Sequence, residues 1–162
     1  MQISKKIVLV GHFGVGKTSL VKRFIQEVFS EEYHTTIGVK VDKKVVKIDN
    51  NEVSLLIWDI AGEASLDAIP DMYLTGAQGA ILVFDYSREA TYINLPEQLD
   101  FIKKKLNNSP IVLVGNKNDL VNENEIKNIL DGLNFGQIIS TSAKTGEGVE
   151  DLFENLARKM IS

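Results

Sequence analysis

The sequence lacks cysteine altogether, and its only arginines are Arg23, Arg88 and Arg158. The absence of cysteine excludes disulfides, thiol catalysis, cysteine-based zinc sites and a direct lipid anchor on a cysteine of this chain. No apolar run approaches the length of a membrane span, and the apolar N-terminal stretch lacks a signal-peptide cleavage pattern. The expected location is therefore cytoplasmic.

Net charge and chain length further limit the class of protein to which this sequence can belong. The net charge is −4, with lysines and acids interspersed along the chain. This balance argues against nucleic acid, and against an anionic membrane surface, as the main partner. A chain of 162 residues is long enough for one hydrophobic core. We therefore expect residues 1–162 to form a single domain.

Short apolar runs recur along the chain, and several are apolar at consecutive positions, as in "KIVLVG", "GAILVFD" and "PIVLVGN". This is typical of strands buried on both faces of a parallel sheet. Helical spacing separates the runs, around Leu20–Phe24, Leu95–Leu106 and Val149–Met160. The runs "VKVDKKVVKI" and "EVSLLIWD" are joined by a turn signal, which predicts an antiparallel edge hairpin. The pattern predicts an α/β fold with a six-stranded, mostly parallel sheet, one antiparallel edge strand, and helices on both faces.

The stretch "GHFGVGKT", residues 11–18, follows the first predicted strand and opens the first helix. It matches the pattern of a loop that cradles phosphates. Glycines let backbone N–H groups converge on an anion, and the helix N-terminus adds a favourable dipole. Lys17 would supply a positive charge to the β- and γ-phosphates, and the Thr18 hydroxyl would bind Mg²⁺. The alternative is a glycine-rich turn that holds no ligand.

Three further strand ends carry polar residues. Asp59 ends the third run, where it could reach a Mg²⁺ ion or merely cap the next segment. "NKND", residues 116–119, follows the fifth run, and the Asp119 carboxylate could accept two hydrogen bonds from guanine. Asn116 and Lys117 could tie this loop to the phosphate loop, and "SAK", residues 142–144, follows the sixth run.

In this order and at these strand ends, the motifs resemble the small GTPases of the Ras superfamily, whose fold is that of P-loop NTPases. The stretches "TTIGV" and "YLTGAQGAILVFD" are most similar to the Rab-like branch. The resemblance implies a guanine-nucleotide-binding switch that binds GTP or GDP with Mg²⁺ and hydrolyses GTP slowly. It also implies effector, exchange-factor and activating proteins as partners, bound through two switch segments at about 29–40 and 60–75.

The resemblance further implies roles for individual residues. Those expected to cradle the phosphates are Gly14, Val15, Gly16, Lys17, Thr18 and Ser19. Those expected around the guanosine are Phe29, Asn116, Lys117, Asp119, Ser142, Ala143 and Lys144. Those expected at Mg²⁺ are Thr18, Thr36 and Asp59. Those expected to take part in hydrolysis are Lys17, Thr36, Gly62 and Glu63.

The chain departs from the family at several positions. Phe13 stands where a small residue is usual, and Glu63 stands where glutamine usually orients the attacking water. We expect the Phe13 backbone N–H to face phosphate while its ring lies over the γ-phosphate side. Val41 replaces the phenylalanine expected beside Trp58 and Tyr73, so partner identity cannot be carried over.

Two other functions compete with the switch. The chain could hold guanine nucleotide permanently as a scaffold, which Phe13 and Glu63 favour. It could also be a P-loop kinase of a small substrate, which the scarcity of arginine and the "NKND" loop disfavour. No arginine lies in the first switch segment, so the sequence disfavours a catalytic arginine supplied by this chain.

Overall fold

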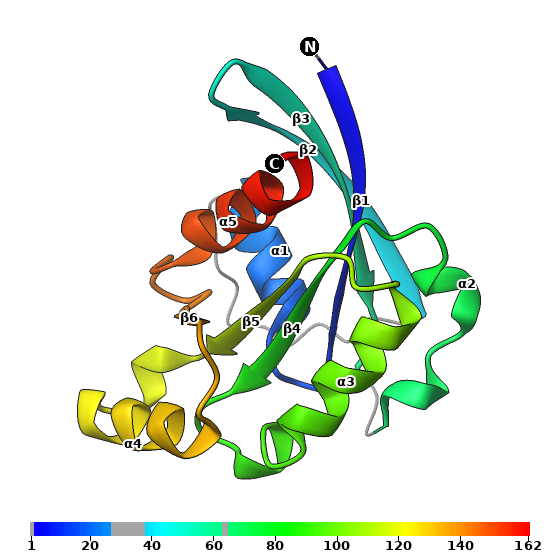
Figure 1. Ribbon diagram of the computed structural model, residues 1–162. Coiled ribbons are helices and arrows are strands. Elements are labelled where there is room, and N and C mark those ends of the chain that lie inside the picture. The colour runs from blue at the N-terminus through cyan, green and yellow to red at the C-terminus, as the bar shows by residue number, and fades with distance from the viewer. Residues whose placement is uncertain (1, 27–37, 63–64) are drawn as a thin grey trace.

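A single twisted sheet forms the centre of the molecule (Figure 1). The computed structural model describes residues 2–26, 38–62 and 65–162. The strands run in the spatial order β2-β3-β1-β4-β5-β6. Their bounds are Gln2–Gly11 for β1, Val39–Ile48 for β2, Asn51–Ile60 for β3, Gly79–Asp85 for β4, Ile111–Asn116 for β5 and Ile138–Ser140 for β6. All neighbours pair in parallel except β2 and β3, which confirms the predicted fold and its antiparallel edge.

The antiparallel edge is a hairpin of two ten-residue strands. Asp49 begins its turn with φ of 55°, a left-handed conformation that aspartate tolerates better than most residues. The register places Ile48 opposite Asn51 and Val41 opposite Trp58. The predicted turn therefore lies where the sequence placed it.

The helices are α1 (Lys17–Gln26), α2 (Asp71–Leu74), α3 (Leu95–Lys105), α4 (Glu123–Leu133) and α5 (Val149–Ile161). Helical spacing predicted α1, α3 and α5, whereas the sequence analysis did not anticipate α4. The Asn122 side chain caps α4 by accepting a hydrogen bond from the Glu125 backbone N–H at 2.8 Å. Apolar residues recur at helical spacing along α4 from Ile126 to Leu133. The sequence therefore contains the pattern that predicts this helix.

Two apolar clusters lie on opposite faces of the sheet. Helices α1 and α5 cover one face of the sheet (Figure 1). On this face Phe24 and Phe153 stack with ring centroids 3.9 Å apart. Helices α2 and α3 cover the other, where Phe84 packs edge-on against Tyr86 and Tyr92. Burying one such side chain stabilises the folded state by about 1.5–3 kcal/mol. The packing on both faces therefore holds the sheet rigidly. Within the described ranges no helix is both long and apolar enough to cross a bilayer.

Candidate nucleotide site

The loop of residues 11–18, called the phosphate loop below, joins β1 to α1. Gly14 and Gly16 adopt φ of 77° and 101°, which side chains rarely tolerate. A Cβ on Gly16 would lie 2.3 Å from Asn116 Nδ2, so this glycine is also required by the close approach of a second loop. The sequence therefore folds here as the predicted strand, loop and helix.

Lys17 and Thr18 lie at the start of α1. The Lys17 side chain is buried, and its Nζ donates to the carbonyls of Gly11 and His12 at 3.2 Å each. The Thr18 hydroxyl donates to Asp59 Oδ2 at 2.6 Å, although 41 residues separate the two. Asp59 is buried at the end of β3. Because Mg²⁺ takes hard oxygen ligands and few of them from protein, this hydroxyl and carboxylate fit that ion.

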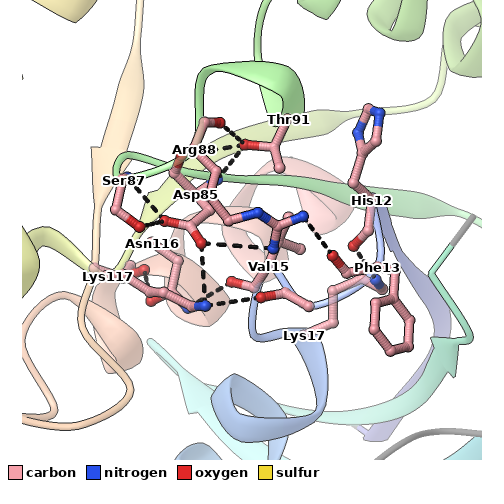
Figure 2. A network of polar contacts seen from close by, with 12 residues as sticks. His12, Phe13, Val15, Lys17, Asp85, Ser87, Arg88, Thr91, Asn116 and Lys117 are labelled. Carbon is pink, nitrogen blue, oxygen red and sulfur yellow. Dashed lines mark hydrogen bonds and ion pairs between the residues drawn. The ribbon is translucent and has the colours of Figure 1, made fainter. Parts of the chain in front are cut away.

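Residues 116–119, called the base loop below, are tied to the phosphate loop by two side chains (Figure 2). Asn116 Nδ2 donates to the Val15 carbonyl at 3.0 Å, and Lys117 Nζ donates to the Gly14 carbonyl at 2.8 Å. Lys117 adopts a left-handed backbone, with φ of 62°, at the turn that follows β5. The link between the base loop and the phosphate loop that the sequence suggested is therefore present.

The loop after β6 lies against the base loop. Asp119 Oδ1 accepts a hydrogen bond from the buried Ser142 hydroxyl at 2.8 Å, and the Thr145 backbone N–H donates to the same hydroxyl at 3.1 Å. Ala143 is buried beside Ser142, whereas Lys144 is exposed. The two described parts of the predicted guanine site, residues 116–119 and 142–144, are thus brought to one edge of the sheet.

The γ-phosphate side contains Gly62 and Phe13 in close contact. A Cβ on Gly62 would lie 2.5 Å from Phe13 Cα, so the two backbones touch. The Phe13 side chain is 52% exposed. Phe29, Thr36 and Glu63, which the sequence also assigned to the site, lie outside the described residues.

Two residues of this region were missed by the sequence analysis as parts of the site: Asp85 and Arg88. Asp85 ends β4 with no exposed surface, and its Oδ2 lies 3.0 Å from Lys117 Nζ and 3.8 Å from Arg88 (Figure 2). The Arg88 guanidinium donates to the Phe13 carbonyl at 2.9 Å. The sequence signal that could have revealed Asp85 is an acidic residue at the end of an apolar strand. Asp59 stands at such a position too.

His12 adds no further positive charge beside Lys17 and Arg88. Burial lowers its pKa, and the positive charges of Arg88 and Lys17 lower it further. Since the ordinary pKa is about 6.5, the imidazole is mostly neutral at pH 7. Lys17 and Arg88 therefore remain the cations on this side of the phosphate loop in the described part of the chain.

Comparison with known sequences decides the class. Residues 6–162 match the sequence model of the Ras family. The chain belongs to the Ras family. It is 38% identical over 163 aligned residues to Ras-related protein Rab-18-B of Danio rerio, covering 96% of this chain and 78% of that protein. It is 37% identical, over 96% of this chain and 80% of the relative, to Ras-related protein Rab-18 of Lymnaea stagnalis.

The family assignment establishes the activity. This Ras-family chain is a Rab-like small GTPase that binds GTP and GDP with Mg²⁺ and hydrolyses GTP slowly to GDP and phosphate. It therefore alternates between two nucleotide states, as a molecular switch. The same finding overturns the kinase hypothesis. Proteins of this family have effectors, exchange factors and activating proteins as partners, and these are the classes of partner to test.

Proposed function

We propose that this Ras-family switch turns itself off more slowly than its relatives and resists activation by a partner's arginine. The observation that carries the proposal is the half-exposed Phe13 ring on a backbone that touches Gly62. An arginine supplied by an activating protein would have to approach the γ-phosphate past this ring. Glu63, which lies outside the described residues, lacks the amide donor that glutamine offers to the transition state.

We also propose the residue roles that the motifs suggest, and the described geometry supports them. Backbone N–H groups of residues 14–19 would bind the phosphates, with the Lys17 ammonium close to them. Thr18 and Asp59, joined at 2.6 Å, would hold Mg²⁺ with Thr36. The ion would supply charge neutralisation between the β- and γ-phosphates. The role of Gly62, to offer its N–H to the γ-phosphate, is supported by its contact with Phe13.

The guanine would be bound by the base loop and the loop after β6. The Asp119 carboxylate would accept hydrogen bonds from two guanine N–H groups, while Ser142 holds its Oδ1. Asn116 and Lys117 would keep this loop fixed against the phosphate loop, and Ala143 and Lys144 would line the base. Phe29 would pack on the edge of the guanosine.

Partner binding is proposed for the segments at about 29–40 and 60–75. Of the described residues there and beside them, Val41 is 50% and Met72 is 72% exposed, and Trp58 lies 6.5 Å from Tyr73 between ring centroids. These side chains could be covered by a partner in one nucleotide state. A single domain over residues 1–162 and a cytoplasmic location stay predictions from the sequence.

Two measurements test the proposal. Denaturing the purified protein and identifying the released nucleotide should yield GDP or GTP. Single-turnover hydrolysis at fixed Mg²⁺ should proceed at or below about 3–5 × 10⁻⁴ s⁻¹, the intrinsic rate of this class with glutamine present. A rate above about 10⁻² s⁻¹ would contradict slow hydrolysis.

The scaffold remains a second candidate, which Phe13 and Glu63 also favour. In that case turnover is so slow that the chain keeps one nucleotide almost permanently, and the switch segments do not respond to it. Undetectable hydrolysis, together with identical protein spectra in GDP and in a non-hydrolysable GTP analogue, would favour the scaffold over the timer.

A further inference from the structure

We propose that Asp85 is a positioning residue of the nucleotide site, which orients the phosphate loop through Lys117 and Arg88. This inference rests on the proposed role of the phosphate and base loops. Asp85 ends β4, in the middle of the sheet, and its side chain has no exposed surface. A buried carboxylate is costly unless it is paired and hydrogen-bonded, so its partners indicate what it does.

The carboxylate is fixed on one side by its own chain. Oδ1 accepts hydrogen bonds from the Ser87 backbone N–H at 2.8 Å and from the Ser87 hydroxyl at 2.6 Å. Thr91 strengthens this turn, because its hydroxyl accepts from the Asp85 backbone N–H at 2.9 Å. These contacts leave Oδ2 directed at the two cations (Figure 2).

Each cation joins Asp85 to a carbonyl of the phosphate loop. Lys117 Nζ lies 3.0 Å from Asp85 Oδ2 and donates to the Gly14 carbonyl at 2.8 Å. Arg88 lies 3.8 Å from the same oxygen through one nitrogen and donates to the Phe13 carbonyl at 2.9 Å through another. One buried anion thus fixes two consecutive peptide groups of this loop.

The consequence for phosphate follows from peptide geometry. In a planar trans peptide the carbonyl and the next N–H point in opposite directions. When the Phe13 and Gly14 carbonyls point towards the cations, the N–H groups of Gly14 and Val15 must point away from them. Those are two of the N–H groups proposed to bind the nucleotide phosphates. Asp85 therefore keeps carbonyl oxygens from turning towards the anion.

The test is the rate at which nucleotide leaves. Purified full chain is loaded with a fluorescent GDP analogue and chased with excess GDP at fixed Mg²⁺. Asp85→Asn keeps the size of the side chain but removes its charge. We expect dissociation to accelerate by about 10- to 100-fold, by analogy with the loss of metal affinity or activity when residues that orient metal ligands are removed. Arg88→Gln should accelerate it less, because Arg88 is half-exposed and farther from Asp85.

Matched controls separate this effect from a general loss of charge. Asp100→Asn makes the same chemical change in the exposed Lys104–Asp100 pair of α3, which is 2.9 Å long. Arg158→Gln makes the same change as Arg88→Gln in the exposed pairs of α5. Both controls should leave the dissociation rate within about twofold of the parent.

A double-mutant cycle distinguishes positioning from simple stabilisation of the fold. Because Asp85 acts through Arg88 as well as Lys117, adding Asp85→Asn to Lys117→Ala should accelerate dissociation no more than Arg88→Gln does alone, and less than Asp85→Asn does in the parent. Fully multiplicative effects would overturn the proposal, as would a parental rate in Asp85→Asn. If Asp85→Asn fails to fold, a parental rate in Arg88→Gln overturns it instead. A parent that retains no guanine nucleotide would contradict the proposed function itself.

Discussion

The two sides of the nucleotide site are built differently. On the guanine side, Asn116, Lys117 and Asp119 each form a side-chain hydrogen bond with another loop. On the side predicted to face the γ-phosphate, the backbones of Gly62 and Phe13 touch and Arg88 donates to the Phe13 carbonyl. Phe13 and Glu63 on that side both depart from the family pattern. Under the roles proposed above, this chain keeps the features that hold nucleotide while changing those that hydrolyse it. Binding and turnover should therefore respond to different substitutions.

The largest effect is expected from Asp119→Ala on the guanine side. Its carboxylate would make two charge-assisted hydrogen bonds to guanine, each worth about 1.5–3 kcal/mol. Losing both should weaken GDP binding by roughly 10²- to 10⁴-fold, measured by equilibrium titration. Asp119→Asn replaces one acceptor by a donor and should favour xanthine nucleotides. Parental GDP affinity in both variants would show that this loop does not bind the base.

The next largest effect is expected from Glu63→Gln on the γ-phosphate side. A carboxylate about 4 Å from the γ-phosphate is repelled by about 1 kcal/mol in water and about 4 kcal/mol at an effective dielectric of 20. Removing that charge should accelerate single-turnover hydrolysis by between about fivefold and 10³-fold. Phe13→Gly should restore stimulation by an arginine-supplying activating protein. GDP affinity should remain parental in Glu63→Gln.

A general-base role for Glu63 predicts the opposite sign. In that case Glu63→Gln would slow a parent that is already fast, above about 10⁻² s⁻¹. One comparison of single-turnover rates at fixed Mg²⁺ distinguishes the two hypotheses, because only the direction of the change is needed.

A smaller effect is expected from Gly62→Ala. The added Cβ would lie 2.5 Å from Phe13 Cα and 2.8 Å from the His12 carbonyl carbon, so the backbone must shift. Overpacking of this kind costs about 1–3 kcal/mol, which should reduce the affinity for a GTP analogue by about fivefold to 150-fold. GDP, which lacks the γ-phosphate, should bind almost as before. Gly132→Ala in α4 serves as the control, because no atom lies within 4 Å of the added Cβ and Gly132 is not among the glycines with positive φ. Equal losses of affinity for GDP and for the GTP analogue would show that Gly62 does not respond to the γ-phosphate.

The smallest signal is expected from Trp58, the only tryptophan. It stands next to Asp59, and Lys6 Nζ lies 3.7 Å above its ring. Its fluorescence should differ between GDP and a non-hydrolysable GTP analogue, since γ-phosphate contacts at Gly62 and Thr36 should repack the strands beside it. Lys17→Ala should lose nucleotide and with it the difference. Identical spectra, with binding verified separately, would support the scaffold.

The fold could be predicted largely from the sequence, because buried parallel strands and amphipathic helices leave strong periodic patterns. Strands β1 to β5 and helices α1, α3 and α5 all carry such patterns. Helix α4 was missed because its apolar stripe is short and only partly buried. The hairpin was recognised because its turn signal lies directly between two strand patterns.

The site was predictable only where a motif is contiguous. Residues 11–18 and 116–119 are such motifs, and their contact follows from the parallel sheet. Asp85 ends the stretch "YLTGAQGAILVFD", which carried only a strand prediction and the family resemblance, and Arg88 belongs to no motif. Their role depends on side chains that meet the phosphate loop across long stretches of sequence, as the Arg88–Phe13 bond does across 75 residues. The charge and burial of Asp85 and Arg88 indicate their role only when the three-dimensional arrangement is known.

The bonds from Asn116 to Val15 and from Lys117 to Gly14 span 101 and 103 residues of sequence. Chains are made from the N-terminus at about 5–20 residues per second, so roughly 5–20 s pass between synthesis of the two halves of this site. During that interval the phosphate loop exists without the base loop that holds it. We therefore expect a nascent chain of this protein to acquire its nucleotide late, after the ribosome has completed most of the sheet.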